Sequence, residues 1–379
     1  MRRLLEPFLL TVTAMLVAGY AYVTWRLATD PRQHVALAIP FVLVWVVPAI
    51  YWGGRRRDQS MLDKLVLQAS YLSMGWLSFL VVLALVRDVV LVTTLWSPAL
   101  ARVHAIARDA GIPIVFAGSL VALLVGTMRA RRGPRVHAIE VSIPDLHPDL
   151  EGFRIAQITD LHVGRDIRRP YVERVVALTK PLKADLIALT GDMVDGSIER
   201  LADEVAPLAE LARASPAFFV LGNHDGYSGA QVWSAHFRKL GFNVLLNTHA
   251  MMERKGARIV VAGVLDPTLR PGPRPDVAIA NAPAAALRVL LAHNPKSAPD
   301  AERVGYDLQL SGHTHGGEFF PWTLVVRRIH GPHHHGLSRR GKMWVYVSPG
   351  TGTWGPPVRL GTRPEVTLLR LVTARSPFP

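Results

Sequence analysis

Apolar residues are arranged differently in the first third of the chain and in the remainder. Before residue 130, four long apolar stretches approach the roughly 20 residues that a helix needs to cross a membrane. They cover residues 8–24, 35–52, 65–86 and 112–128, and none has an Asp, Glu, Lys, Arg or His in its interior. Buried helices of a soluble bundle are the alternative, but such helices normally carry a charged face. The pattern therefore predicts about four transmembrane helices.

A different pattern begins after residues 129–135, which read as a basic linker with Gly133 and Pro134. Short apolar runs there alternate with helical patterns, which is typical of an α/β domain. Strands are expected at residues 137–143, 153–158, 186–189, 218–221, 244–246, 258–262, 288–291, 308–310, 343–347 and 366–369, and helices at 171–179, 198–213 and 230–240. The proline-rich segment 267–283 predicts a loop. We therefore expect a transmembrane region at 1–135 and an α/β domain at 136–379.

Composition agrees with a chain that lies partly in lipid. Half of the residues are hydrophobic, the mean hydropathy is +0.22, and there is no cysteine. A disulfide framework, a thiolate metal site and a cysteine nucleophile are therefore excluded together. The net charge is +14, but residues 1–135 carry 15 Lys/Arg against 6 Asp/Glu, so most of the excess flanks the apolar stretches. That placement favours a topology signal and contact with anionic lipid, and no nucleic-acid partner is expected.

The basic residues near the ends of the four stretches predict an orientation. Five lie on one side, and ten lie on the other: Arg2, Arg3, Arg55, Arg56, Arg57, Lys64, Arg129, Arg131, Arg132 and Arg135. An even number of spans then places both termini and the α/β domain in the cytoplasm, on a multi-pass inner-membrane protein. The Arg2-Arg3 pair is also compatible with twin-arginine export, but three further apolar stretches follow the first.

Short polar clusters follow five of the predicted strands. Ligands of α/β proteins gather at the carboxyl ends of strands, so these side chains are expected to meet at one edge. The clusters contain His, Asp and Asn without sulfur, which suits a catalytic Mn, Fe or Zn site better than a structural zinc site. The candidate metal ligands are Asp160, His162, Asp192, Asn223, His293, His313 and His315.

Seven such ligands are enough for two divalent metal ions with positions left for substrate. Two ions about 3.5–4 Å apart share a carboxylate, bind both oxygens of a phosphate and convert a bridging water to hydroxide near neutral pH. The sequence therefore predicts a metal-dependent phosphoesterase that acts through a hydroxide activated by two metals.

The motifs Asp-x-His, Gly-Asp, Gly-Asn-His-Asp, a lone His and Gly-His-x-His occur in this order over about residues 153–317. In this they resemble the calcineurin-like metallophosphoesterase superfamily, whose fold is a four-layer α/β/β/α sandwich. The segments 346–350, 357–360 and 363–365 further resemble its bacterial membrane-associated branch, which includes lipid-linked pyrophosphatases of the UDP-diacylglucosamine type.

The resemblance implies a role for each candidate. One metal is bound by Asp160, His162, Asp192 and His315, and the other by Asp192, Asn223, His293 and His313, so that Asp192 is the bridge. The resemblance further implies that His224 donates a proton to the leaving oxygen and that Asp195 orients its ring. The chain departs from the branch pattern at Glu318, where Gln commonly follows the paired glycines.

Several readings stay open at this stage. Asp195 with Gly196 is also an ordinary turn dipeptide, and Asp225 either orients His224 or caps the next segment. The tract His333, His334 and His335 resembles a metal-binding sequence, but the seven-ligand site is complete without it, and a mobile loop near the site is expected instead.

Taken together, the expected activity is hydrolysis of a phosphodiester or pyrophosphate bond in a phosphorylated, lipid-linked substrate such as UDP-diacylglucosamine. The alternative is a membrane sensor or scaffold whose phosphoesterase domain binds ligand without essential catalysis. A periplasmic phosphatase would require the opposite topology.

Overall fold

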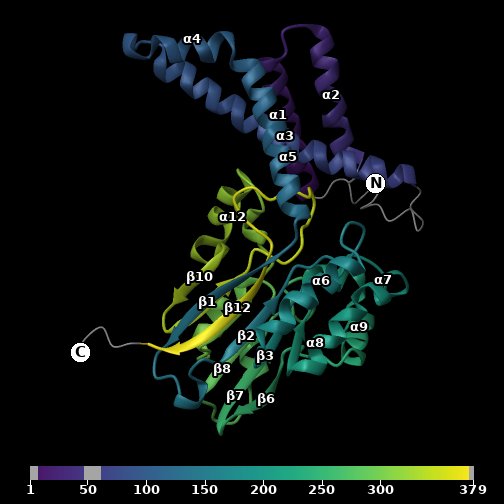
Figure 1. The fold of residues 1–379 in the computed structure, drawn as a ribbon, viewed down its shortest axis with the longest axis vertical. Helices are drawn as coiled ribbons and strands as arrows, with labels where there is room; N and C mark the ends of the chain where they lie inside the picture. The colour runs from purple at the N-terminus through teal and green to yellow at the C-terminus, as the bar shows by residue number, and fades with distance from the viewer. Residues whose placement is uncertain (1–6, 47–60, 375–379) are drawn as a thin grey trace. The chain divides into compact units, whose positions relative to one another are not determined.

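The structure, a computed structural model, describes residues 7–46 and 61–374 of the 379-residue chain (Figure 1). These residues form two compact units. The first contains the chain up to Arg131 together with Gly355–Leu360, and the second contains Arg132–Trp354 and the residues from Gly361 onward. The second unit begins at Arg132, and its first strand begins at Arg135, the last residue of the predicted transmembrane region.

The first unit is helical. Its helices are α1 (Pro7–Leu27), α2 (Pro31–Val46), α3 (Met61–Thr94), α4 (Ala101–Asp109) and α5 (Gly111–Arg131). A small apolar core that includes Val23, Leu37, Leu80 and Val115 joins α1, α2, α3 and α5. The described parts of the apolar stretches therefore pack against one another as helices.

Within the described residues, two helices are long and apolar enough to cross a membrane, namely α3 and α5. They contain the predicted spans 65–86 and 112–128. The span 8–24 lies in α1, whereas α2 ends at Val46 after 16 residues and the rest of span 35–52 lies outside the described residues. Arg2, Arg3, Arg55, Arg56 and Arg57, on which the orientation partly depends, lie outside them as well. The prediction of four transmembrane helices is therefore not confirmed.

A charged pair joins two helices of this unit. The guanidinium of Arg26 donates to Asp88 through Nε at 2.7 Å, and the Tyr22 hydroxyl donates to the same carboxylate at 2.8 Å. Charged groups next to apolar helices are stable when they are paired. This network ties the end of α1 to α3.

The second unit contains two six-stranded sheets. The first has the order β1 (Arg135–Ile143), β12 (Glu365–Thr373), β2 (Arg154–Ile158), β3 (Leu186–Thr190), β4 (Ala217–Val220) and β5 (Asn243–Val244). The second has the order β10 (Gly336–Arg340), β11 (Met343–Val347), β9 (Leu308–Ser311), β8 (Leu287–Leu291), β7 (Ala257–Gly263) and β6 (Thr248–Arg254). Strands β2 to β5 are parallel to one another, as are β7, β8, β9 and β11.

The two sheets pack face to face, and helices cover the outer face of each, which gives four layers. Ile155 and Leu186 point into a core shared with Ile259 of the second sheet, whereas Ala156 and Ile187 point into a core shared with helices. The first sheet is covered by α6 (Arg169–Thr179), α7 (Ile198–Val205), α8 (Ala209–Ala214) and α9 (Asn223–Lys239) (Figure 1). The second sheet is covered by α10 (Pro275–Ile279) and α11 (Ala298–Arg303). The helices α6 to α9 lie together on one face. This is the α/β/β/α arrangement that the resemblance implies.

Some predicted elements were wrong. The expected helix 198–213 is broken into α7 and α8 because Pro207 interrupts it. The segment 267–283 is not a pure loop, since α10 begins at Pro275 in a first-turn position. Strands β6 and β10 were missed because both are half-exposed edge strands without alternating apolar residues. Helix α12 (Trp322–His330) was missed as well.

The histidine tract is not the mobile loop that was expected. His333 lies in the 3₁₀ turn η9 (Gly331–His334), where its side chain is buried and its Nδ1 lies 2.7 Å from the Ser338 hydroxyl. The carbonyl of His334 accepts a hydrogen bond from the Thr314 hydroxyl at 2.7 Å. The tract therefore supports the turn that carries His313 and His315.

Candidate metal centre

The loops that follow five parallel strands meet at one edge of the second unit. Within the first sheet, the His162 amide donates to the Asp192 carbonyl at 3.0 Å, which joins the loops after β2 and β3. Between the sheets, the Gln157 side chain donates to the Ser311 carbonyl at 2.9 Å. The carboxyl ends of both sheets are thus held together, and all seven predicted ligands lie there.

The first group of side chains contains Asp160, His162 and His315, whose potential ligand atoms lie within 4.8 Å of one another. His315 Nε2 lies 3.3 Å from Asp160 Oδ1 and 3.1 Å from His162 Nε2. All three side chains are buried. The Asp160 carboxylate also accepts from the His313 amide and the Thr159 hydroxyl, which fixes its position.

The second group contains Asp192, His293 and His313. His293 Nε2 lies 3.1 Å from Asp192 Oδ2, and His313 Nδ1 lies 3.3 Å from His293 Nε2. Asn223 joins this group, since its side-chain oxygen lies 3.1 Å from His313 Nδ1. The second set of predicted ligands therefore also comes together.

Asp192 lies between the two groups. Its Oδ2 atom is 3.1 Å from His293 Nε2 on one side and 3.9 Å from His162 Nε2 on the other. Its Oδ1 atom accepts from the His224 amide at 2.8 Å. Asp192 therefore contacts side chains of both groups.

Several imidazoles are oriented by a hydrogen bond at their second nitrogen. His293 Nδ1 lies 2.9 Å from the Thr190 carbonyl, His162 Nδ1 lies 3.1 Å from Asp195, and His315 Nδ1 lies 3.1 Å from Glu318. Such partners fix the ring and direct the other nitrogen inward. Glu318, which the sequence singled out as a departure from the branch pattern, thus contacts His315 at i, i+3 spacing.

The backbone of the site is unusually bent. Asp160, His162, Asp192, His313 and His315 all have φ between 50° and 70°. Side chains rarely adopt this left-handed region, and residues held there cluster at functional sites. Gly312 is required for a related reason, because a Cβ at this position would clash with the Asp160 carboxylate. The strand ends therefore store strain in order to direct these side chains toward one point.

The charges of the two groups shift their pKa values. Burial opposes ionisation of Asp160 and Asp192, but the positive charge of His315 lowers the pKa of Asp160 and that of His293 lowers the pKa of Asp192. Burial likewise opposes protonation of the rings, yet Asp192 raises the pKa of His293 to about 10 and Asp160 raises that of His315 to about 9. Burial and the charge of His293 lower the pKa of His313 to about 3. Protons on His293 and His315 thus compensate the buried carboxylates.

This donor set fits divalent metal ions. Imidazole nitrogens, carboxylate oxygens and one amide oxygen suit Zn, Fe and Mn, and the site contains no sulfur. The cationic charge that His293 and His315 supply to the carboxylates is the charge that a metal would supply instead. The six ligand candidates other than His313 are buried. The chain can therefore hold metal at the carboxyl ends of the strands.

His224 lies beside these groups without belonging to the predicted ligands. Its Nδ1 lies 2.7 Å from Asp195 Oδ1, and its ring packs edge-on against His162 with centroids 4.8 Å apart. Burial lowers the pKa of His224, but the hydrogen bond with Asp195 and the charge of Asp192 outweigh burial and raise it. Tyr227 and Trp354, both exposed, flank the ring at 5.8 and 5.6 Å. Neither contact was predicted from the sequence. The i, i+3 spacing of His224 and Tyr227 on α9 indicates that these two side chains are neighbours, whereas no sequence pattern indicates the contact with Trp354.

The open question about Asp225 is answered by its contacts. Its buried carboxylate accepts from the backbone amides of Gly222, Asp192, Met193 and Val194 at 2.8–3.1 Å. Burial, and then the charge of Asp192, raise the pKa of Asp225 to about 7. Asp225 therefore caps the loop that carries Asp192, and it does not orient His224.

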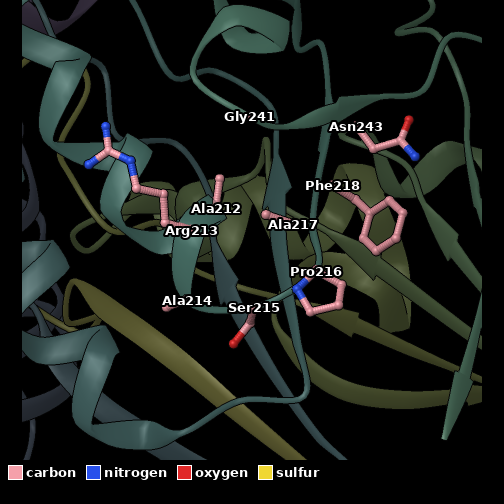
Figure 2. Close-up of a pocket in the computed structure, with 9 residues that line it drawn as sticks. All are labelled: Ala212, Arg213, Ala214, Ser215, Pro216, Ala217, Phe218, Gly241 and Asn243. Carbon is pink, nitrogen blue, oxygen red and sulfur yellow. The ribbon is translucent and has the colours of Figure 1, made fainter.

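A hollow elsewhere in this unit is separate from the site. Figure 2 shows its lining residues, among them Arg213, Ser215 and Asn243, around the start of β4. Asn223 follows the opposite end of β4. The hollow therefore lies at the wrong end of the strands to take part in metal chemistry.

Comparison with known proteins decides the family. A profile of the calcineurin-like phosphoesterases matches residues 153–317. The chain is 34% identical over 226 residues to an uncharacterized metallophosphoesterase of Aquifex aeolicus, and the match covers 58% of this chain and 85% of that protein. The chain belongs to the calcineurin-like metallophosphoesterase family.

Two further metallophosphoesterase relatives carry informative names. The chain is 33% identical over 267 residues to the transmembrane protein with metallophosphoesterase domain of Danio rerio. This match covers 67% of this chain and 61% of that protein. The chain is 33% identical over 234 residues to phosphodiesterase YaeI of Escherichia coli, covering 58% of this chain and 82% of that protein. The chain spans about three-fifths of the length of the vertebrate relatives it matches.

Proposed function

We propose that this chain is a membrane-anchored phosphodiesterase that uses two divalent metal ions to hydrolyse a phosphodiester or pyrophosphate bond. The observation that carries the proposal is the position of the Asp192 carboxylate between two groups of imidazoles, with His224 beside it. In a protein of the metallophosphoesterase family, this arrangement favours catalysis over a structural metal site.

The proposed ligands of one metal are Asp160, His162, Asp192 and His315, and those of the other are Asp192, Asn223, His293 and His313. When bound, the metals would polarise the phosphate and lower the pKa of a water molecule. The chain itself would hold both ions against one carboxylate and exclude bulk water, since its ligand side chains are largely buried.

We further propose that His224 is the general acid. Because Asp195 occupies its Nδ1, the proton is available at Nε2. The hydrogen bond with Asp195 and the charge of Asp192 raise the pKa of His224 against opposing burial, which favours the protonated ring that a donor to the leaving oxygen must have. Tyr227 and Trp354 both pack edge-on with this ring and would contact the leaving group.

The proposed substrate is lipid-linked. The apolar helices α3 and α5 support this, because a protein held at a bilayer meets lipid substrates at a high local concentration. A nucleotide-linked acylated sugar, UDP-diacylglucosamine, is the first specific candidate. Detergent-purified protein that cleaves other diesters but leaves this compound intact would exclude it.

The topology belongs to the same proposal. Four membrane spans and a cytoplasmic catalytic unit follow from the excess of basic residues on one side. Reporter fusions placed after residue 135 test this directly. A reporter that is active only in the cytoplasm supports it, and one that is active only outside supports the periplasmic alternative.

The activity is tested with bis(p-nitrophenyl) phosphate. Purified protein should cleave it in the presence of Mn²⁺ and lose the activity after chelation. The Asp192→Asn variant should lose activity, whereas the matched control Asp276→Asn, on the exposed surface of α10, should retain it. Normal turnover by the Asp192→Asn variant contradicts the proposal.

A further inference from the structure

Helix α12 follows the Gly-His-x-His motif directly and exposes apolar side chains. Leu324 is 54% exposed and Ile329 is 61% exposed, and Phe320 and Val325 are exposed beside them. No residue of α12 is buried. Contiguous apolar residues on the surface mark an interaction site rather than a folded core. The four side chains and the exposed Arg327 and Arg328 together form what we term the α12 face.

Helix α12 itself is basic, since it contains Arg327 and Arg328 and no Asp or Glu. Arg327 and Arg328 stand on the same exposed side of the helix as Leu324 and Val325. Such a combination of apolar and basic side chains is typical of helices that lie in the interface of anionic membranes.

We propose that the α12 face docks on the headgroup layer of an anionic lipid bilayer. A nucleic acid would satisfy the arginines but would leave Leu324 and Ile329 in water, whereas a bilayer interface satisfies both. This rests on the proposed membrane anchoring, in which α3 and α5 of the same chain would hold the face near such a surface. The docking goes beyond the proposed hydrolysis and does not require it.

The docked helix would be joined to the metal centre by short contacts. Helix α12 packs against η8 (His315–Gly317), which carries a proposed ligand. At its other end, the His330 ring lies edge-on to the His313 ring with centroids 6.0 Å apart. A phosphate held in the headgroup layer therefore comes to the side of the site that carries the Gly-His-x-His motif.

The absence of cysteine makes a direct test possible. A fluorophore is attached to the cysteine of the Ile329→Cys variant of the full-length protein. The labelled protein is reconstituted in nanodiscs that contain doxyl-labelled lipid. The matched control is Val277→Cys, which replaces an exposed valine on α10. We expect strong quenching of the label at position 329 in discs with phosphatidylglycerol, because interfacial helices bury their apolar face by about 5–10 Å. The label at position 277 should not be quenched.

The arginines are tested in the same background. Each basic residue near an anionic surface strengthens docking roughly fivefold, so Arg327→Gln with Arg328→Gln should reduce the ratio of docked to undocked protein about 25-fold. Discs of phosphatidylcholine alone should reduce quenching in the same direction. The Asp192→Asn variant should be quenched as the parent is, which separates this proposal from the proposed function.

Two outcomes would overturn the docking. The first is quenching at position 329 that does not exceed quenching at position 277, or that is equal with and without phosphatidylglycerol. The second is a blue shift of the label without quenching that grows with the number of protein copies in each disc, because it would assign the α12 face to a second copy of the chain.

Discussion

Asp195 Oδ1 lies 2.7 Å from Nδ1 of His224. The same carboxylate lies 3.1 Å from Nδ1 of His162, a proposed metal ligand. One side chain therefore orients both the proposed acid and one wall of the proposed metal site. Changes at Asp195 should affect proton transfer and metal binding together, whereas changes at His224 should affect proton transfer alone.

The first prediction concerns His224. Loss of a general acid lowers turnover by about 10²–10⁴-fold when the leaving group needs a proton. The His224→Ala variant should therefore be strongly impaired with an alkyl leaving group and only slightly impaired with p-nitrophenolate, which leaves without a proton. The exposed His137→Ala variant is the control. Equal losses with both leaving groups contradict the acid role.

The same variant separates enzyme from scaffold in the cell. A sensor or scaffold tolerates the loss of chemistry, so His224→Ala would rescue a deletion phenotype. The proposed function expects no rescue, provided that the variant reaches the membrane at the parent level.

The second prediction concerns Glu318. Its carboxylate lies 3.1 Å from Nδ1 of His315 and accepts from the Trp354 amide at 2.9 Å. Removal of such a partner weakens metal binding by about 10–100-fold. Glu318→Ala should do so, whereas Glu318→Gln keeps an acceptor oxygen and should stay close to the parent. Metal titration measures the affinity of each variant. The control is Glu253→Ala, a change at an exposed residue of the edge strand β6. If Glu318→Ala binds metal with the affinity of the parent, Glu318 does not support metal binding through His315.

The third prediction is a pH dependence of metal binding. Asp192 and Asp160 raise the pKa of His293 to about 10 and that of His315 to about 9, against opposing burial. Below these values each ring carries a proton that metal must displace. The apparent affinity should therefore rise with pH between 6 and 9, with release of protons on binding. Calorimetry in buffers of different ionisation enthalpy measures the protons, and a heat that is independent of the buffer argues against the competition.

The fourth prediction concerns Asp225. Its carboxylate accepts from four buried backbone amides around Asp192. An amide without a partner costs roughly 1–3 kcal/mol. Asp225→Ala should therefore lower the thermal midpoint in detergent more than Asp225→Asn, which keeps one acceptor oxygen. The exposed Asp203→Ala is the control. A thermal midpoint of Asp225→Ala equal to that of the parent would contradict the capping role.

Most of the proposed metal ligands could be predicted from the sequence, because their positions follow the order of the strands. Each proposed ligand follows a buried apolar strand within a few residues, and parallel strands end at the same edge, so Asp160, Asp192 and His293 could be brought together without coordinates. The break at Pro207 was also readable, and the expected helix 198–213 should have ended before it.

Other features depend on contacts between distant segments. Glu318 reaches His315 only because it has φ of 54° and the turn closes on itself, which no propensity predicts. Trp354 meets His224 across 130 positions of the chain. Strands β6 and β10 exist because a neighbouring strand offers hydrogen bonds, and not because their own residues alternate.

The most direct test of the account is the metal content of the purified protein, measured together with diester hydrolysis. If Asp192 bridges two cations, the active parent should contain about two equivalents of Mn, Fe or Zn. Asp192→Asn should lose metal and activity together, whereas Asp276→Asn should keep both. Full activity in protein that contains no metal, or Asp192→Asn with the parent's metal content and turnover, would contradict the central claim.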